Sequence, residues 1–256
     1  MAESDYQDYT WRSSDGTLLE LHDQISYTVL REGIHGFAET TEERVTAAQA
    51  SYYSERLNSR TSKARELGFT VMIIGSNHAD LETKRAALIK AMSQPGRLYR
   101  RKDDGTVLYI DCYSARGSPA IPDGLPKGNL ARQQRVNITL TAPDPHFYSV
   151  TEITQTGSGT ITLTNAGTAG KTPCTLTLSA DTAGNTTTGE SMSARSGQGV
   201  SGAVVTSDDA GVTAVLNGTN VLNRFTLDSD FFMLVPGQNV LTGVSQVKYR
   251  PRWNGI

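Results

Sequence analysis

Catalysis and metal binding need side chains that the fold brings together, and this sequence offers few local arrangements of that kind. No two of its histidines stand two or four residues apart, the spacings at which one strand or helix turns two imidazoles toward one metal ion. The chain also has no GxSxG motif and no comparable cysteine motif for a nucleophile. We therefore predict no catalytic residue, no cofactor and no bound metal. We expect surface or packing roles for His22, His35, His78 and His146.

Neighbouring carboxylates occur four times, and a glycosidase does need two carboxylates on either side of a sugar. All four pairs stand in segments whose composition is typical of turns, loops or strand edges, where acidic side chains are solvated. We interpret them as surface groups. The pairs are Glu42-Glu43, Asp103-Asp104, Asp208-Asp209 and Asp228 with Asp230.

One segment, Gly197-Gln198-Gly199-Val200-Ser201-Gly202, matches the GxGxxG pattern of dinucleotide-binding loops. That chemistry needs a buried strand before the loop and, after it, a helix whose N-terminus meets the phosphate. The residues before this segment are polar, and those after it are rich in Val and Thr. The pattern therefore indicates a glycine-rich loop and not a nucleotide site.

Eight basic residues cluster between positions 97 and 135, where they could meet a phosphate backbone or an acidic partner. Four aspartates are interspersed among them, and the whole chain has 24 basic and 26 acidic residues. Because nucleic-acid binders concentrate positive charge, we expect no specific nucleic-acid binding and favour a protein interface or an ordinary hairpin surface. The cluster comprises Arg97, Arg100, Arg101, Lys102, Arg116, Lys127, Arg132 and Arg135.

The length of 256 residues and the hydrophobic fraction of 37% are those of a folded protein with a sizeable core. The longest apolar run, residues 231–235, is far shorter than the roughly 20 residues of a membrane-spanning helix. The first residues are acidic and polar, unlike a secretory signal, so we expect no membrane insertion and synthesis in a cytoplasm. Cys112 and Cys174 lack a CxxC spacing, and we expect both to be small buried hydrophobic residues.

Charge density changes sharply along the chain. Residues 1–150 carry 18 basic and 19 acidic side chains, whereas residues 151–256 carry 6 and 7. Such a change indicates two domains, and the two prolines of Pro143-Asp144-Pro145 favour an extended connection between them. We place the boundary within 142–152 and predict domains at 1–145 and 146–256.

The first part predicts one strand, one helix and one hairpin in that order. Alternating apolar residues at 67–73 indicate the strand, and Asn77 can cap a helix whose apolar face includes Leu81, Leu88, Ile89 and Met92. Asp103-Asp104-Gly105 then separates two strand-like runs, 97–102 and 106–113. Alternation at 136–140 predicts a further strand. Residues 40–63 fit either a helix or a long exposed loop.

The second part is rich in threonine and in short alternating runs, which predicts an antiparallel sandwich or a jelly roll without a helix. Val247, Tyr249 and Trp253 share one side of a predicted strand, which favours core packing for all three. The expected strands include 161–163, 174–178, 212–216, 224–227, 231–235 and 247–253.

Three groups of residues carry a resemblance to a known family. The first is the strand, helix and hairpin order over 67–113, and the second is Asp144-Pro145-His146-Phe147-Tyr148. The third combines Asn165-Ala166-Gly167 and Pro173 with the later turn that contains Leu234, Pro236, Gly237 and Asn239. Together they resemble the distal tail protein family of siphophages, the bacteriophages with long non-contractile tails.

The resemblance implies a mainly β protein: a ring-forming β-sandwich with one helix, followed by a galectin-like antiparallel β-sandwich on the outside of the ring. It implies a homo-hexameric structural hub in the virion, at the distal end of the tail. Its partners would be the tail tube protein, a tail-associated lysin or tail-tip hub protein, and a receptor-binding protein. The chain has no room for an inserted carbohydrate-binding module.

Two other functions stay open at this point. A carbohydrate-binding adhesin of the tail could use Tyr249 or Trp253 as an exposed aromatic platform. A cell-wall hydrolase could use carboxylates that are dispersed in the sequence and converge in the fold.

Overall fold

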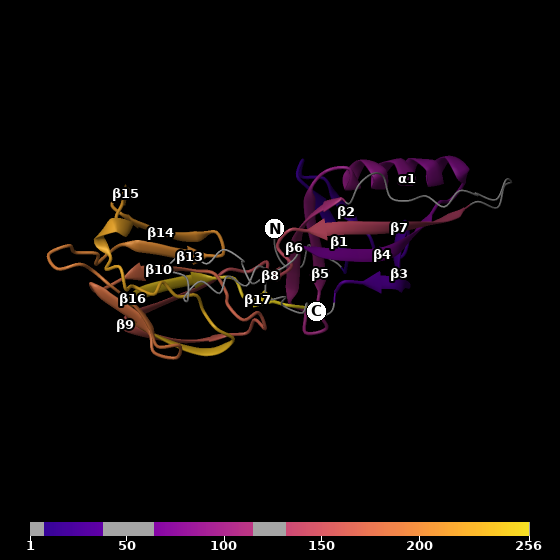
Figure 1. Ribbon diagram of the computed structural model, residues 1–256. Coiled ribbons are helices and arrows are strands. Elements are labelled where there is room, and N and C mark those ends of the chain that lie inside the picture. Colours follow the sequence, from indigo (N-terminus) through magenta and orange to yellow (C-terminus); the bar gives the residue numbers. More distant parts are fainter. Residues whose placement is uncertain (1–7, 38–63, 115–131, 256) are drawn as a thin grey trace, which may run out of the picture. The chain divides into compact units, whose positions relative to one another are not determined.

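The computed structural model describes residues 8–37, 64–114 and 132–255 (Figure 1). The chain divides into two compact units, Met1–Phe147 with Asn254–Ile256 (unit 1) and Tyr148–Trp253 (unit 2). In the described ranges, no helix has the length and apolar character to cross a membrane. The predicted segment 40–63 and the basic residues Arg116 and Lys127 lie outside the described residues.

In its described residues, unit 1 is an antiparallel sheet with one helix, and its strands follow the order β2-β1-β5-β6-β7-β4-β3. Figure 1 shows β4 and β7 running across the direction of β5 and β6. The mainly β character and the predicted strand, helix and hairpin order are confirmed. The elements are β1 (Thr10–Ser13), β2 (Leu18–Glu20), β3 (Tyr27–His35), β4 (Arg65–Ile74), α1 (His78–Met92), β5 (Gly96–Arg101), β6 (Val107–Ser114) and β7 (Gln133–Ala142).

Helix α1 begins and ends where its sequence signals stand. The Asn77 side chain accepts a hydrogen bond from the Asp80 N–H, which satisfies one of the free donors of the first turn. The helix packs against β1, β2 and β4 through a buried face that includes Leu81, Leu88 and Met92. Ile89, predicted on this face, is only half-buried, and Ala91 is buried.

The core of unit 1 lies beneath the alternating residues of β4 and β7. Leu67, Phe69, Val71 and Ile73 are buried, and β4 pairs along its whole length with β7. The Trp11 indole donates to the Ala91 carbonyl at 3.0 Å, so the end of α1 is hydrogen-bonded to β1.

Unit 2 is a second antiparallel sheet, in the order β12-β11-β16-β10-β13-β14-β15 with β9 paired to β16. A short 3-10 turn, η3 (Leu222–Arg224), is its one helical segment within the described residues. The strands of this sheet are β9 (Ile153–Asn165), β10 (Cys174–Leu178), β11 (Thr182–Asn185), β12 (Glu190–Ser193), β13 (Val204–Asp208), β14 (Gly211–Leu216), β15 (Thr219–Asn220) and β16 (Gly237–Tyr249). Two short strands outside it, β8 (Phe147–Ser149) and β17 (Arg252–Trp253), pair with each other.

The long strand β16 bends where its register with β9 shifts, near Gly243. Gly243 has a φ of +69°, and a Cβ atom there would stand 2.0 Å from the Thr182 carbonyl oxygen. Only glycine fits this position, and the bend lets the sheet curl around its own core. Val247 and Tyr249 lie in the core of unit 2, and Trp253 is buried as well, so the predicted burial is confirmed. The predicted single strand 247–253 is wrong, because β16 ends at Tyr249 and Trp253 belongs to the separate strand β17.

Two more predicted strands of unit 2 are wrong. Residues 224–227 form the end of η3 and a turn, with a single bridge from Phe225 to Ala194. Residues 231–235 are extended but make a single bridge, from Leu234 to Thr172. Their alternation is real, since Phe232 and Leu234 are fully buried, but it comes from insertion into the core and not from pairing in a sheet.

Candidate functional site

Apart from the neighbouring Asp144 and His146, the described residues whose types could do chemistry do not gather into one site. In the part of the chain that the structure describes, no group of three His, Cys, Asp or Glu residues could hold a metal ion. Cys112 and Cys174 are buried and unpaired, as predicted, and burial raises the pKa of the Cys174 thiol to about 12. The GxGxxG segment is a loop that leads into β13, so its predicted lack of a following helix is confirmed. Of the acidic pairs, Glu42-Glu43 lies outside the described residues.

The motif Asp144-Pro145-His146-Phe147 ends unit 1 and is held tightly. One oxygen of Asp144 accepts the His146 backbone N–H at 3.1 Å and lies 2.6 Å from its Nδ1. Pro145 is buried, and its ring fixes the backbone of this turn. Phe147 is buried as well, so the side chain next to the boundary anchors the chain in unit 1.

Phe147 belongs to an aromatic cluster that connects distant parts of unit 1. Its ring stacks on Phe37 with centroids 6.1 Å apart, and Phe37 in turn contacts Tyr9 and Phe69. The guanidinium of Arg65 lies 5.1 Å from the centre of the Phe147 ring. Aromatic and cation–π contacts of this kind add to the free energy gained from burial alone.

Arg65 is the buried charge of this region. Burial lowers the pKa of Arg65 to about 10, an effect that the charge of Asp144 partly opposes. One terminal nitrogen donates to the Asn254 carbonyl, while Nε and the other terminal nitrogen have no hydrogen-bond partner in the described structure. Burying Arg65 in this way lowers the stability of the fold, because the guanidinium loses its hydration and two of its nitrogens gain no hydrogen bond in return.

The motif Asn165-Ala166-Gly167 forms a turn at the end of β9. The Asn165 side chain accepts the Gly167 N–H at 3.1 Å and donates to Thr172 Oγ1 at 3.0 Å. A Cβ atom on Gly167 would lie 2.3 Å from the Arg252 carbonyl oxygen, so a larger residue would push the chain away from β17. Pro173 is half-buried directly before β10, next to this turn.

The motif with Pro236, Gly237 and Asn239 closes the turn before β16. The buried Asn239 amide accepts the Val235 N–H at 3.0 Å and donates to the Val235 carbonyl at 2.8 Å. Gly237 has a φ of +82°, which glycine adopts without strain. Asn165 also donates to the Val235 carbonyl, at 3.3 Å, so two motifs 70 residues apart meet at one backbone group.

Two contributors to this region lie outside the motifs found in the sequence. Asn185 donates to Asn239 from β11, and the buried Arg252 pairs with Asp209 at 2.7 Å. Asp209 had been expected to be only a solvated turn residue.

Tyr249 and Trp253 are only 4% and 6% exposed, so neither supplies the surface platform that a carbohydrate-binding adhesin needs.

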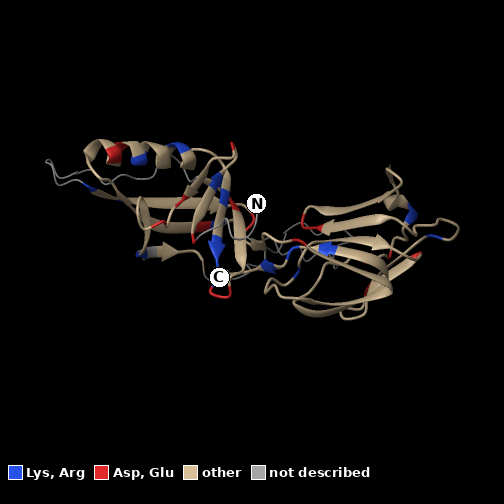
Figure 2. Ribbon diagram, turned by 180° about the vertical axis from the view of Figure 1, so that it is seen from behind, with Lys and Arg blue, Asp and Glu red and all other residues tan. Residues whose placement is uncertain are grey.

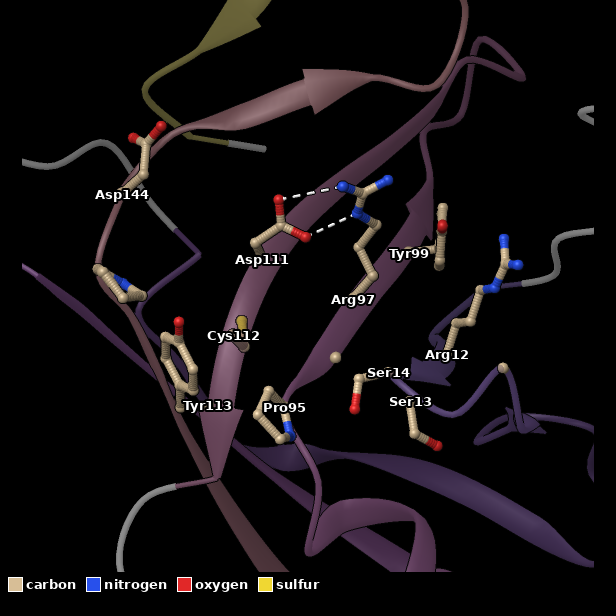
Figure 3. Close-up of a pocket in the computed structure, with 13 residues that line it drawn as sticks. Arg12, Ser13, Ser14, Pro95, Arg97, Tyr99, Asp111, Cys112, Tyr113 and Asp144 are labelled. Carbon is tan, nitrogen blue, oxygen red and sulfur yellow. Dashed lines mark hydrogen bonds and ion pairs between the residues drawn. The ribbon is translucent and has the colours of Figure 1, made fainter. Parts of the chain in front are cut away.

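The basic hairpin β5–β6 borders a groove of about 710 Å³ in unit 1 (Figure 3). Arg97 forms two hydrogen bonds with Asp111, of 2.6 and 3.3 Å, and its guanidinium lies 4.2 Å from the centre of the Tyr109 ring. Basic and acidic residues are interspersed over unit 1 (Figure 2). The groove therefore presents paired charges, which suit a protein contact better than a phosphate backbone.

Comparison with known proteins gives a consistent result. Residues 166–253 match the family model described as "Siphovirus-type tail component, C-terminal domain". The fold is similar to that of the Dit protein (gp 19.1) of phage SPP1, whose structure is described as a paradigm of the hub adsorption apparatus in phages that infect Gram-positive bacteria. The identity is 16% and the TM-score 0.58, over 96% of this chain and 99% of that one.

A chain of the phage P2 baseplate in its activated conformation with calcium also matches. It is 9% identical, with a TM-score of 0.43 over 98% of this chain and 100% of that chain. No curated protein sequence matches this chain.

Proposed function

Through residues 166–253 this chain belongs to the siphovirus-type tail components, the distal tail proteins, and from that premise we propose that it assembles as a six-copy ring. As a distal tail protein it is a structural component of the virion at the far end of the tail. The ring would connect the tail tube to the baseplate or tail tip and to the host-adhesion device. The observation that carries the proposal is the family match in unit 2, within a chain that shares the fold of the SPP1 protein over nearly its whole length.

A ring needs two different surfaces on each copy, because head-to-tail contacts close only when one surface meets another of complementary shape. We assign ring formation to the domain at 1–145 and an outer, galectin-like position to the domain at 146–256. The sheet of unit 1 has two unlike edges, β2 and β3, and one mixed-charge hairpin. These features supply the unlike surfaces that such a contact requires.

A closed ring also has two chemically different faces, so each face can bind its own partner. We propose the tail tube protein on one face and a tail-associated lysin or tail-tip hub protein on the other. A receptor-binding protein would then attach to the periphery. None of these roles uses a catalytic residue.

We propose that the family-like motifs act by holding each unit in shape. Asp144, Pro145 and Phe147 anchor the end of unit 1, while Pro236, Gly237 and Asn239 close a turn of unit 2. Pro173 connects Thr172, whose hydroxyl accepts a hydrogen bond from Asn165, to the start of β10. This interpretation rests on the burial of Pro145, Phe147 and Asn239 and on the hydrogen bonds that Asp144 and Asn239 make with nearby backbone.

Negative-stain electron microscopy of the purified chain over a concentration series tests the proposal, with the mass measured by light scattering on the same samples. We expect six-fold rings and a mass that rises toward six copies. If the chain stays monomeric alone, the same measurement is repeated with the tail tube protein added. A monomer under both conditions would contradict the ring.

A further inference from the structure

The chain contains two Asn-Gly pairs, Asn217-Gly218 and Asn254-Gly255. An asparagine side chain is lost as ammonia most readily at such pairs, because glycine has no Cβ atom to keep its backbone nitrogen away from the amide carbon. The two pairs differ in their surroundings. Asn217 is exposed in the two-residue turn between β14 and β15, whereas Asn254 is half-buried in unit 1, where the chain bends.

The backbone carbonyl of Asn254 accepts a hydrogen bond from a buried guanidinium. The donor is a terminal nitrogen of Arg65, a residue of β4 that is only 3% exposed. This carbonyl belongs to the same peptide group as the nitrogen of Gly255, and that N–H donates to no described residue. A cation bonded to a carbonyl oxygen stabilises negative charge on the peptide group, so the Gly255 N–H loses its proton more readily.

Arg65 has no carboxylate in direct contact. Its Nε and second terminal nitrogen have no hydrogen-bond partner in the described structure, and the charge of Asp144 acts on it without an ion pair. The nearby Cys112 thiol stays protonated, because burial raises its pKa far above the usual value. A carboxylate formed at position 254 would belong to the residue that Arg65 already contacts, and guanidinium groups bind carboxylates through paired hydrogen bonds.

We propose that Asn254-Gly255 is a self-modification site at which Arg65 promotes the conversion of Asn254 to aspartate. The deprotonated Gly255 nitrogen attacks the Asn254 Cγ atom and forms a C–N bond, and the side-chain nitrogen takes up a proton and leaves as ammonia. Water then opens the cyclic imide to a carboxylic acid, as aspartate or isoaspartate, and the acid ionises by releasing a proton. Water is the one co-reactant, and the product is a carboxylate beside Arg65.

The new ion pair should stabilise unit 1. A buried ion pair usually costs the dehydration of two charges, but the Arg65 guanidinium is buried already and position 254 is only half-buried. Asn254→Asp supplies the product directly and should raise the Tm of unit 1 by about 2–4 °C. The same change made together with Arg65→Met should give no gain, because the cation is then missing. Asn217→Asp, in the exposed turn, is the matched control and should leave this Tm unchanged.

Peptide mapping by mass spectrometry measures the reaction on the full chain during incubation in a mildly alkaline buffer. Exchange of the amide NH₂ for OH changes the mass of the Asn217 and Asn254 peptides separately, so each sample reports two rates. We expect Asn254 to convert in the wild type. In Arg65→Met its rate should fall about tenfold or more, because the developing negative charge loses its hydrogen bond. The Asn217 rate should stay the same and serves as the internal clock.

Arg65→Gln keeps a hydrogen-bond donor without the charge, and it replaces Arg65→Met if that variant does not fold. Misfolding is recognised by a rise of both rates, since both pairs then become flexible. Three results would overturn the proposal: an Asn254 that stays unmodified in the wild type, an Asn254 rate that neither Arg65 variant lowers relative to Asn217, or an Asn254→Asp chain without a raised Tm. Both residues lie in unit 1 of one copy, so none of these results depends on ring assembly.

Discussion

The two units keep buried polar groups in different ways. Unit 1 buries a charge, Arg65, against aromatic rings and leaves two of its nitrogens without partners among the described residues. Unit 2 also buries a guanidinium, that of Arg252, but pairs it with Asp209. Its buried amides bond each other and one turn: Asn185 donates to Asn239, and Asn165 and Asn239 both donate to the Val235 carbonyl. A neutral amide loses less hydration free energy on burial than a guanidinium does. We infer that packing stabilises the end of unit 1 and that hydrogen bonds stabilise the corresponding turn of unit 2.

Each unit carries one tryptophan, which lets the comparison be measured unit by unit. Trp11 is fully buried in unit 1, and Trp253 is nearly so in unit 2. In Trp253→Phe the fluorescence reports unit 1 alone, and in Trp11→Phe it reports unit 2 alone. Each variant below is therefore made in both backgrounds.

The largest expected effect is that of Phe147→Ala in unit 1. Loss of this buried ring leaves a cavity beside Phe37 and should lower the free energy of unfolding reported by Trp11 by about 3–5 kcal/mol. Phe147→Leu, which refills much of the space, should cost clearly less. Urea unfolding followed by fluorescence measures both. An equal loss reported by Trp253 would show that the units unfold together and would remove the distinction between them.

Asn239→Ala should have the next largest effect, and in unit 2. It removes hydrogen bonds to Val235, Gly237 and Asn185 and leaves buried groups unsatisfied, which should cost about 2–3 kcal/mol in the transition reported by Trp253. Asn223→Ala is the control, because Asn223 is exposed. A cost for Asn239→Ala as small as that of the control would mean that the amide network adds little to stability.

The smallest expected effect is that of Asp23→Asn on the pH dependence of stability in unit 1. Burial raises the pKa of Asp23, but hydrogen bonds from the Tyr27, Ile25 and Ser26 N–H groups outweigh it, and the pKa of Asp23 is lowered overall. This contribution is fully present above the unfolded pKa of about 3.9 and is lost as the pH falls through the lower folded value. The Trp11 transition should therefore lose more Tm between pH 5 and pH 2 in the wild type than in Asp23→Asn.

The Trp253 transition supplies the internal reference for that experiment. Asp23 lies in unit 1, so Asp23→Asn should leave the pH dependence of unit 2 unchanged. The decisive background is Trp253→Phe, in which Trp11 reports unit 1. If Tm falls with pH equally in the presence of Asp23 and of Asp23→Asn, these three hydrogen bonds do not favour the ionised carboxylate.

Local sequence signals determined much of the architecture. The alternation in β4, the Asn77 cap of α1 and the Asp-Gly turn of the β5–β6 hairpin each act over a few residues, so they could be read without a structure. The motif residues Asp144 and Asn239 were also found in the sequence. Their chemistry is short-range, since Asp144 bonds the backbone two residues away and Asn239 bonds Val235 four residues away.

Other features were decided only by contacts between distant segments. The alternation at 231–235 predicted a strand, yet whether an extended segment pairs or is inserted into a core depends on which backbone lies beside it. Asn185 and Arg252 join their networks across 54 and 43 positions of sequence, and a groove of about 770 Å³ in unit 2 forms where Arg195, Val212 and Phe231 converge. The sequence thus determined the elements and the turns that close on themselves, whereas the tertiary structure alone decided which buried polar groups meet and where an apolar surface stays open.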